Sequence, residues 1–574
     1  MTYRSLAILF FLSALVATAC AQVNFTVSGP LRHPDPGQIY VVTVVVHGFP
    51  ADVPHDIGVR IDTPGVLQTF SVACYDSDPV SSSPSEVVYR RNVTGARGPV
   101  VLKIGLRSKT DFRGTYRLMP FVRRTGETTD LASTTRFISV GTLPAPVVTS
   151  PRSGKINSPA PTTRFILNNA YVVPVTHEIE YQTSAGLRSF VTPSQNSGQT
   201  ISHYVTADIG LREGPATCRV RAVDGAGYAG DWSDVIPFTV SGGMDLAGAC
   251  SQATFANFRA KGWTSHFQAS WGGRNKWPDA RQNLINAHNA GMKVATYAFL
   301  NFDNSSSIPG APADQTGIWQ MEQCLTNIGF NGNKSSLIYD LKYVVIDVEN
   351  TYVGTMTPAN RVQRIAEAVQ HARNYGFWPA IYTRNQGVNT WWNTYTGNST
   401  DFSDLPLWGS YPETSSANFK DHLDLDAGSP WVTFGGWTTR AGKQYQLDTT
   451  IMGVRVDLNV WDPAIWEVMS PNPGMPSIMA GAAIRRQPGG GFWLDISVMN
   501  TGTCEAYAVR VNGITLNGAP STPTQSLRRI DAGNQKTFTR SYGAGAGQLG
   551  QTVPVTFTVW TGMGPQSFNI NVTL

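Results

Sequence analysis

The chain has 574 residues, of which 41% are hydrophobic and 14% are charged, and its formal net charge is +5. This length favours roughly three to five domains, and the composition excludes a disordered chain. The positive charge is too sparse to indicate a nucleic-acid-binding protein. The 55 glycines and 36 prolines indicate many turns, as in β-rich modules.

Residues 1–21 have the pattern of a secretory signal peptide. One basic residue, Arg4, precedes an apolar run, and Ala19-Cys20-Ala21 forms a small-residue cleavage site. The apolar run is too short to span a membrane, and no later stretch of the sequence is long enough either. We therefore expect a secreted protein without a membrane span.

Sequons of the N-x-S/T type fit a secreted glycoprotein, although such triplets also arise by chance. They start at Asn24, Asn92, Asn304, Asn333, Asn398 and Asn571.

The cysteines predict one disulfide. Cys250 and Cys324 fall in the same predicted domain, so we expect a bond between them. The sequence has no C-x-x-C pair, no H-E-x-x-H and no glycine-rich phosphate loop. We therefore predict neither a metal site nor a nucleotide cofactor.

Two β-rich modules are predicted before the middle of the chain. Residues 22–142 contain alternating β-branched runs with turn residues every 8–12 positions, which is typical of a β-sandwich. After a proline-punctuated linker, residues 143–241 continue in the same way. The end of this second module, CRVRAVDGAGYAGDWSDVIPFTV (218–240), resembles the last two strands of a fibronectin type III domain.

Strand-like and helical stretches alternate in residues 242–468. Helices are predicted near 279–290, 316–328 and 358–375, between apolar runs such as KVATYAF and KYVVIDV. About eight strands in this length predict a (β/α) barrel of the TIM type with incomplete helices, although an open doubly wound sheet fits the same count. Residues 469–574 return to the β pattern and predict an immunoglobulin-like β-sandwich.

The candidate chemistry lies at the end of LKYVVIDVEN (341–350). Side chains alternate along a strand, so Asp347 and Glu349 face the same way. Two carboxylates on one face at the end of a buried strand are costly without a cation or a proton between them. A solvated pair is the alternative interpretation. Asp245 and Asp457 also follow strand-like runs, so four carboxylates would meet at one end of a barrel, an arrangement suited to glycoside cleavage.

The order and spacing of several motifs resemble family 25 of the glycoside hydrolases, the Chalaropsis-type lysozymes or muramidases. The motifs are MDLAG, YVVIDVEN, WPAIYT, LPLWGSYP and KQYQLDTTIMGVRVDLNVW, within residues 243–466. This resemblance implies a barrel that cuts the β-1,4 bond between N-acetylmuramic acid and N-acetylglucosamine in peptidoglycan. Polysaccharide is thus the expected partner, and the β modules provide surfaces for self-association.

The resemblance also implies residue roles. Glu349 would be the general acid, Asp347 would orient the acetamido group or stabilise the developing cation, and Asp245 and Asp457 would complete the acidic floor. The positions that would line the sugar groove are Tyr382, Trp408, Tyr411 and Gln446. Trp391 and Trp392 could form a further platform, but adjacent tryptophans on a helix diverge, so we expect at least one to be packed.

Two departures from the family pattern leave other functions open. Leu-Ala-Gly-Ala-Cys follows Asp245, and the usual Trp-Gln-Tyr is represented by Tyr445-Gln446-Leu447. An extracellular structural or adhesive glycoprotein with a non-catalytic barrel is the main alternative, and a glycan-binding module that does not cut is the other.

Overall fold

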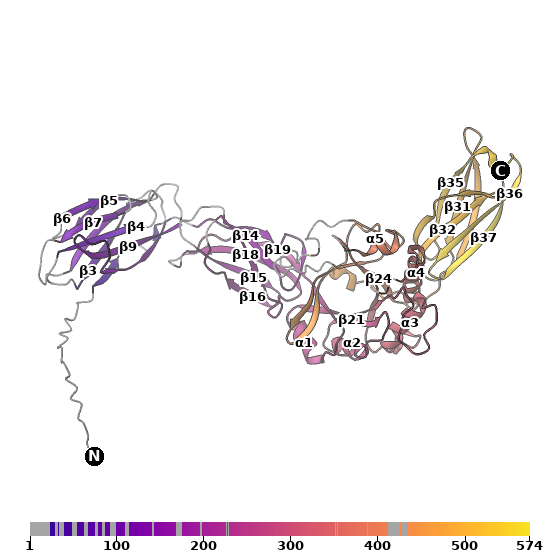
Figure 1. Cartoon of the computed structure of the whole chain (residues 1–574), viewed down its shortest axis with the longest axis horizontal. Coiled ribbons are helices and arrows are strands. Elements are labelled where there is room, and N and C mark those ends of the chain that lie inside the picture. Colours follow the sequence, from indigo (N-terminus) through magenta and orange to yellow (C-terminus); the bar gives the residue numbers. More distant parts are fainter. Residues whose placement is uncertain are drawn as a thin grey trace, which may run out of the picture.

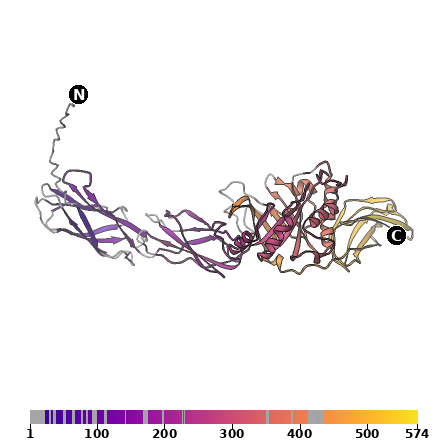
Figure 2. The same ribbon diagram turned by 90° about the horizontal axis from the view of Figure 1, so that it is seen from below.

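The computed structural model describes most of the chain from residue 23 to residue 574. The undescribed segments within that range are 29–31, 34–38, 49–53, 62–66, 75–77, 83–85, 92–98, 109–113, 141–142, 168–174, 196–197, 225–226, 228, 350–351, 353, 387–388, 411–424 and 426–432. The predicted signal peptide also lies outside the described residues. Two pairs of sheets, a closed barrel and a third pair of sheets follow one another in chain order along one long axis (Figures 1 and 2).

The first pair of sheets has the strand orders β1-β3-β8-β5 and β2-β11-β9-β4-β7-β6, with β10 added to β9. Alternate residues of β3, including Val42, Val44 and Val46, point into one core that also holds Ile57 and Val59 of β4. The strands are β1 (Asn24–Ser28), β2 (Arg32–His33), β3 (Ile39–His47), β4 (His55–Ile61), β5 (Leu67–Cys74), β6 (Asp78–Ser82), β7 (Glu86–Arg91), β8 (Val100–Ser108), β9 (Gly114–Arg124), β10 (Ala132–Ser133) and β11 (Arg136–Val140).

The second pair has the orders β12-β14-β17 and β13-β19-β18-β15-β16. Its last two strands, β18 and β19, pair antiparallel. The likeness of this stretch to a fibronectin type III domain stays a prediction. The strands are β12 (Val147–Ser150), β13 (Ile156–Asn157), β14 (Thr162–Ile166), β15 (Thr176–Thr183), β16 (Gly186–Val191), β17 (Thr200–Tyr204), β18 (Gly214–Val223) and β19 (Ile236–Val240).

The middle of the chain forms a closed barrel of eight strands in the order β20-β21-β22-β23-β24-β27-β28-β29. The strands are β20 (Gly242–Leu246), β21 (Trp263–Gly272), β22 (Lys293–Phe299), β23 (Leu341–Val348), β24 (Trp378–Thr383), β27 (Leu407–Ser410), β28 (Gly442–Ile451) and β29 (Val454–Trp461). The short strands β25 (Asn385–Gln386) and β26 (Asn389–Thr390) form a separate hairpin.

The prediction of a (β/α) barrel of the TIM type is wrong. The chain is mostly β, with 49% strand and 14% helix, and β29 pairs antiparallel with both β28 and β20. Antiparallel neighbours need no helical crossover. A two-residue turn joins β28 to β29, with Met452 at φ 50° and Gly453 at φ 78°, the positive angles that a tight hairpin of this kind requires. The barrel therefore closes through a hairpin instead of a last helix.

Helices cover the outside of the first strands (Figure 1). They are α1 (Gln252–Ala260), α2 (Ala280–Asn289), α3 (Gly317–Asn327), α4 (Pro358–Asn374) and α5 (Trp391–Thr396). The predicted helices near 279–290, 316–328 and 358–375 correspond to α2, α3 and α4. The longest, α4, is capped by the Thr357 side chain, starts with Pro358 and is followed by Gly376 at φ 84°.

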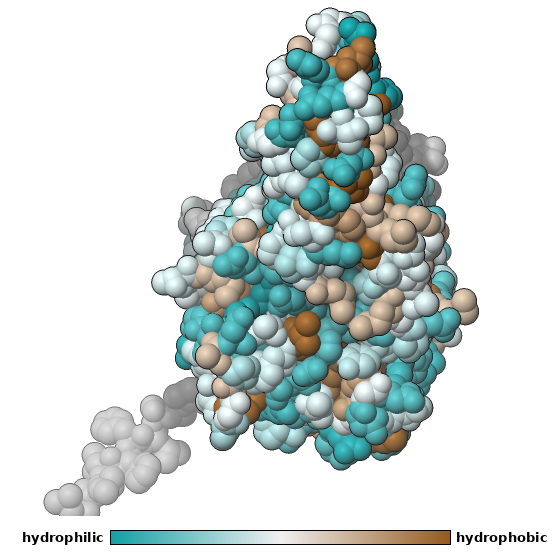
Figure 3. Space-filling model, turned by 90° about the vertical axis from the view of Figure 1, so that its right-hand side faces the viewer, coloured by the Kyte–Doolittle hydropathy of each residue, from teal (hydrophilic) through white to brown (hydrophobic). Residues whose placement is uncertain are grey.

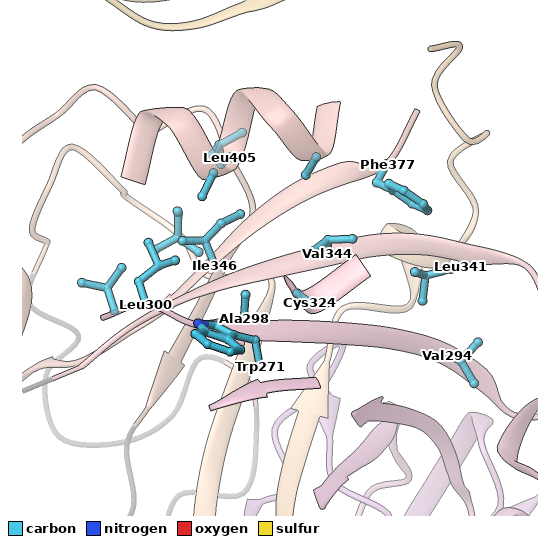
Figure 4. Packing of buried hydrophobic residues seen from close by; sticks show 14 of the residues in the cluster. Trp271, Val294, Ala298, Leu300, Cys324, Leu341, Val344, Ile346, Phe377 and Leu405 are labelled. Carbon is cyan, nitrogen blue, oxygen red and sulfur yellow. The ribbon is translucent and has the colours of Figure 1, made fainter. Parts of the chain in front are cut away.

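Strand β23 has two apolar faces because it is buried on both sides. Val344 and Ile346 point outward into the core between barrel and helices, where they pack in one cluster with Cys324 of α3 (Figure 4). Tyr343 and Val345 point inward and belong to a separate cluster inside the barrel. The same alternation directs the next inward positions, Asp347 and Glu349, toward the barrel interior.

The third pair of sheets follows the barrel, with the orders β30-β31-β35 and β33-β32-β36-β37, and with β34 on β32. From this end of the molecule the surface is mainly hydrophilic, with isolated apolar patches (Figure 3). The strands are β30 (Ile478–Arg486), β31 (Phe492–Asn500), β32 (Ala506–Leu516), β33 (Ala519–Ser521), β34 (Gln525–Ile530), β35 (Gln535–Tyr542), β36 (Thr552–Thr561) and β37 (Gly564–Thr573).

The barrel packs against the sheets before and after it, and at both contacts two backbone segments approach each other closely. A Cβ on Gly262 would lie 1.9 Å from the carbonyl oxygen of Leu211, and one on Gly562 would lie 2.2 Å from that of Ala366 on α4. The buried Gln370 of α4 accepts from the Tyr507 N–H at 2.8 Å and donates to the Glu505 carbonyl at 2.9 Å. The glycines thus allow close approach, and the Gln370 amide satisfies backbone groups that the junction buries.

Candidate active site

Four carboxylates converge at one end of the barrel. Asp347 and Glu349 stand at the end of β23, while Asp245 of β20 lies directly opposite Asp457 of β29 in the antiparallel pairing. β20 and β29 are distant in sequence but adjacent in the closed barrel. Barrel closure therefore brings the first and last acids together, and the inward alternation of β23 adds the other two.

These side chains line one cavity of about 320 Å³. Its lining consists of acids, aromatic rings and a few polar groups: Asp245, Tyr297, Asp347, Glu349, Tyr382, Arg384, Trp391, Trp408, Ser410, Gln444, Leu447, Asp448 and Asp457.

Burial raises the pKa of all four acids, and the charge of at least one neighbouring carboxylate adds to each rise. Burial, followed by the charge of Asp457, raises the pKa of Glu349 to about 7. Burial raises the pKa of Asp457 to about 6, although the backbone N–H of Asp448 donates to its carboxylate at 2.6 Å and opposes the rise. The pKa values of Asp245 and Asp347 rise well above their usual range, first through burial and then through the neighbouring carboxylates. The cavity can therefore hold protons near neutral pH.

Side-chain amides orient the acids on β20 and β29. Asn459 donates to Asp245 at 2.7 Å, and Gln444 Nε2 lies 3.3 Å from Asp245 Oδ1 and 3.2 Å from Asp457 Oδ2. Tyr382 donates its hydroxyl to Gln444 Oε1 at 2.7 Å. Because Gln444 Oε1 accepts this bond, its NH₂ group must face the two carboxylates.

Asp347 is held differently from the other acids. Its Oδ1 atom is buried and has no hydrogen-bond partner within the described part of the chain. A buried carboxylate oxygen without a donor is costly, so this atom is a ready acceptor for a ligand N–H or O–H in the cavity.

Some of the aromatic residues expected at the groove line the cavity, and others are packed in the core. Tyr382 and Trp408 line the cavity but are only 6% and 2% exposed, and their rings meet edge to face with centroids 4.7 Å apart. Trp391 lines the cavity and is half-buried, whereas Trp392 is fully buried against Trp437. The expected divergence of the two adjacent tryptophans is confirmed.

Gln444, not the predicted Gln446, reaches the acids. The pairing of β28 with β29 is irregular between Gln444 and Gln446, so simple alternation does not continue along this strand. Tyr445 points away from the barrel interior, and its hydroxyl meets that of Ser158 at 2.7 Å. The usual Trp-Gln-Tyr of the family is better matched by Lys443-Gln444-Tyr445, which keeps the second and third residues of the motif. This match would have identified Gln444. Tyr411, also predicted to line the groove, lies outside the described residues.

Asp303 is not among the cavity-lining acids. It follows β22, pairs with Arg274 at 3.1 Å and accepts from the Ser305 N–H at 3.0 Å. These bonds are those of a turn residue.

The predicted disulfide between Cys250 and Cys324 is absent. Both thiols are free and buried: Cys250 precedes α1, and Cys324 lies on α3, facing the carbonyl of Tyr297. The prediction rested on shared domain membership, whereas a disulfide needs Cα atoms about 4.4–6.8 Å apart. Helix α2 lies between α1 and α3 along the barrel, which separates the two cysteines (Figure 1).

The predicted glycosylation positions in the described chain are exposed. These are Asn24, Asn304, Asn333, Asn398 and Asn571, whereas Asn92 lies outside the described residues. Within the described ranges, no cluster of three or more His, Cys, Asp or Glu side chains is arranged to hold a metal ion. None of the described helices is long and apolar enough to cross a membrane.

The middle of the chain is similar to known lysozyme-like proteins. Residues 238–445 match the family described as lysozyme-like protein 1. The chain is 31% identical over 178 residues to a probable GH family 25 lysozyme 3 of Dictyostelium discoideum, covering 31% of each protein. It is 26% identical over 193 residues to counting factor 50 of the same organism, covering 33% of this chain and 55% of that protein. The chain thus matches about a third and about half of the length of these two relatives.

A solved structure, the spore cortex lytic enzyme SleM of Clostridium perfringens, is 14% identical with a TM-score of 0.30, covering 58% of this chain and 98% of that one. The predicted resemblance is confirmed by the family match: the barrel segment is lysozyme-like, and lysozymes are glycosidases.

Proposed function

We propose that the chain is a secreted glycoside hydrolase that cleaves the β-1,4 bond between N-acetylmuramic acid and N-acetylglucosamine in peptidoglycan. The observation that carries this proposal is the cavity with four carboxylates of raised pKa in a lysozyme-like barrel. Glycoside cleavage needs one protonated acid beside at least one ionised carboxylate.

The resemblance to family 25 suggests the first two roles, and the pKa values of Glu349 and Asp457 support them. Glu349, with a pKa of about 7, keeps its proton at near-neutral pH and donates it to the leaving glycosidic oxygen. Asp457, with a pKa of about 6, ionises first and supplies negative charge to the developing sugar cation. The two values belong to a coupled set of acids, so the pH profile of activity reports the set.

The other two acids position the substrate and the charge. The unpartnered Oδ1 of Asp347 accepts a hydrogen bond from the acetamido N–H of the substrate. Asp245, fixed by Asn459 and Gln444, completes the acidic floor of the cavity opposite Asp457. Trp391 provides a flat ring for the apolar C–H face of a sugar.

The remaining expectations are part of the same proposal. Residues 1–21 direct export, the sequon asparagines carry glycans where the host attaches them, and the chain divides at 22–142, 143–241, 242–468 and 469–574. The flanking β modules position the barrel on its polymer and provide surfaces for self-association.

The test is lysis of purified peptidoglycan by the intact protein and by Glu349→Gln. We expect this variant to lose about 10²- to 10⁴-fold in kcat/KM, the usual contribution of general acid catalysis. Asp303→Asn is the matched control, because Asp303 is an acid in the turn after β22 that does not line the cavity, and its activity should stay within about twofold.

Equal activity of wild type and Glu349→Gln, or no activity in either, would overturn the proposal. The second outcome would favour the alternative of an extracellular structural protein with a non-catalytic barrel.

A further inference from the structure

Strand β16 (Gly186–Val191) is the outermost strand of one sheet in the second pair. That sheet has the order β13-β19-β18-β15-β16, so in the described part of the chain no strand pairs with the far side of β16. Figure 1 shows β16 at the lower margin of these sheets, next to β15. An outermost strand presents unpaired backbone N–H and C=O groups, to which a further strand can bond.

The hydrogen bonds between β15 and β16 show which backbone groups face outward. Directly after β16, the Thr192 N–H donates to the carbonyl of His177 on β15. Bonding alternates along an antiparallel pair, and the two-residue turn between the strands gives the same alternation. The even-numbered residues of β16 therefore bond to β15. The N–H and C=O groups of Leu187, Ser189 and Val191 face away from it.

Apolar side chains accompany these outward-facing groups. Leu187 is 54% exposed and Val191 is 64% exposed. Charged side chains on an outermost strand hinder pairing with another chain, whereas exposed apolar ones favour it. The outermost strand β35 of the third pair is protected in this way, because it carries Lys536 and Arg540. Strand β16 carries a single charge, on Arg188.

The sequence of β16 is complementary to itself when two copies run antiparallel about Ser189. In that register Ser189 lies opposite its own counterpart, and Leu187 lies opposite Val191. Residues whose backbone groups face outward are then opposite each other, as antiparallel pairing requires. Arg188 lies opposite Phe190, whose half-buried ring offers a cation–π contact.

The neighbouring registers fit less well. Pairing about Arg188 would place two guanidinium groups directly opposite each other, and like charges in that position are destabilising. Pairing about Phe190 would place Leu187 opposite Pro193, which has no N–H to donate. The side chains therefore favour the register about Ser189.

We propose that β16 pairs with β16 of a second copy of this chain, across a twofold axis at Ser189. The two sheets then join into one, and each contact occurs twice. This inference rests on the self-association named in the proposed function and gives it a strand and a register, whereas cleavage by the barrel is independent of it. Two strands of six residues bury less area than a standard stable interface, so the dimer is weak and forms only at higher protein concentration.

The experiment is sedimentation velocity of the intact protein over a range of concentrations. Val191→Lys should weaken self-association roughly tenfold or more, because each dimer loses two apolar contacts. Ser189→Pro removes an N–H that faces away from β15 and should have a similar effect. Val235→Lys is the matched control, because Val235 is a 55% exposed valine that precedes β19, and it should leave self-association unchanged.

A mixture of two variants tests the register. Leu187→Glu and Val191→Lys should each fail to associate alone. In the register about Ser189 an equimolar mixture places the two introduced charges, which are opposite in sign, beside each other. The mixture should therefore associate to within about tenfold of wild type.

The outcomes separate this inference from the proposed function. Self-association that neither Val191→Lys nor Ser189→Pro weakens would overturn pairing through β16 and assign the contact to another surface. A mixture that does not recover would overturn the register. A wild-type protein that stays monomeric at all concentrations but lyses peptidoglycan would overturn the dimer and leave the proposed cleavage intact.

Discussion

The two halves of the barrel interior are built by the same strands but differ in what they contain. We call the end of the barrel away from the acids the lower half, and the end with the acid-lined cavity the upper half. In the lower half, Phe267 stacks on Trp461 with ring centroids 4.1 Å apart and planes 11° apart, and Trp466 packs against both Phe267 and Tyr343. In the upper half, inward-facing positions further along the strands carry acids. A single strand can contribute to both halves: β23 supplies Tyr343 to the lower half and Asp347 to the upper half. The lower half thus stabilises the fold, and the upper half lowers its stability to create a reactive site.

The largest expected effect on stability comes from the aromatic half. Phe267→Ala should lower the free energy of unfolding by about 3–5 kcal/mol, because it removes a buried ring that contacts three others and leaves a cavity. Urea unfolding followed by tryptophan fluorescence measures it. Phe267→Leu keeps most of the volume and should cost less than half as much. A loss below about 1 kcal/mol in Phe267→Ala would contradict the assignment of stability to this half.

The acidic half should make stability fall as pH rises. The pKa of Glu349 is raised from its ordinary 4.5 to about 7, so the folded chain holds a proton that the unfolded chain releases. This contribution is complete below about pH 4.5 and is lost as pH rises through about 7, amounting to roughly 3 kcal/mol. The difference in unfolding free energy between wild type and Glu349→Gln, measured from pH 4 to pH 8, isolates it.

Titrating groups outside the cavity, such as the buried His266 with its pKa lowered to about 4, affect both proteins alike and cancel in that difference. The neighbouring acids Asp245 and Asp347 feel the charge of Glu349, so the difference reports Glu349 together with its effect on them. Asp303→Asn should reproduce the wild-type pH profile. Parallel profiles for wild type and Glu349→Gln would show that Glu349 does not hold the extra proton.

A smaller effect is expected from the amide that links two acids. Gln444→Leu removes the donor that faces Asp245 and Asp457, and should lower kcat/KM roughly 10- to 100-fold on peptidoglycan. Gln446→Leu is the matched control, two positions along the same strand and outside the cavity lining, and should change activity less than twofold. If the two variants lose activity equally, the acids are not oriented through Gln444.

The four acids could be located from sequence because each follows a strand-like run, and strand ends of one barrel share an edge. Asp245 and Asp457 are more than two hundred residues apart in the chain, yet the position of each beside a strand-like run was enough to predict that they meet. Gln444 could not be chosen over Gln446 in the same way. A bulge changes which side of a strand faces inward, and its position depends on the pairing partner.

The closure of the barrel and the cysteine pairing show where local pattern is insufficient. Met452-Gly453 between two β runs is a hairpin signal that argues against a final helix, but it is only two residues long. Cys250 and Cys324 lie in one domain, yet only the three-dimensional order of α1, α2 and α3 shows that they do not meet. Both errors concern relations between elements, not the elements themselves.

The glycines at the junctions have a consequence for how the molecule moves. Gly262 packs closely against Leu211 and Gly562 against Ala366, so backbone lies against backbone on both sides of the barrel and bending there would break these contacts. The barrel, the sheets of residues 147–240 and those of residues 478–573 should therefore tumble in solution as one elongated particle. A polymer bound by the sheets on either side of the barrel would then reach the cavity in one fixed orientation.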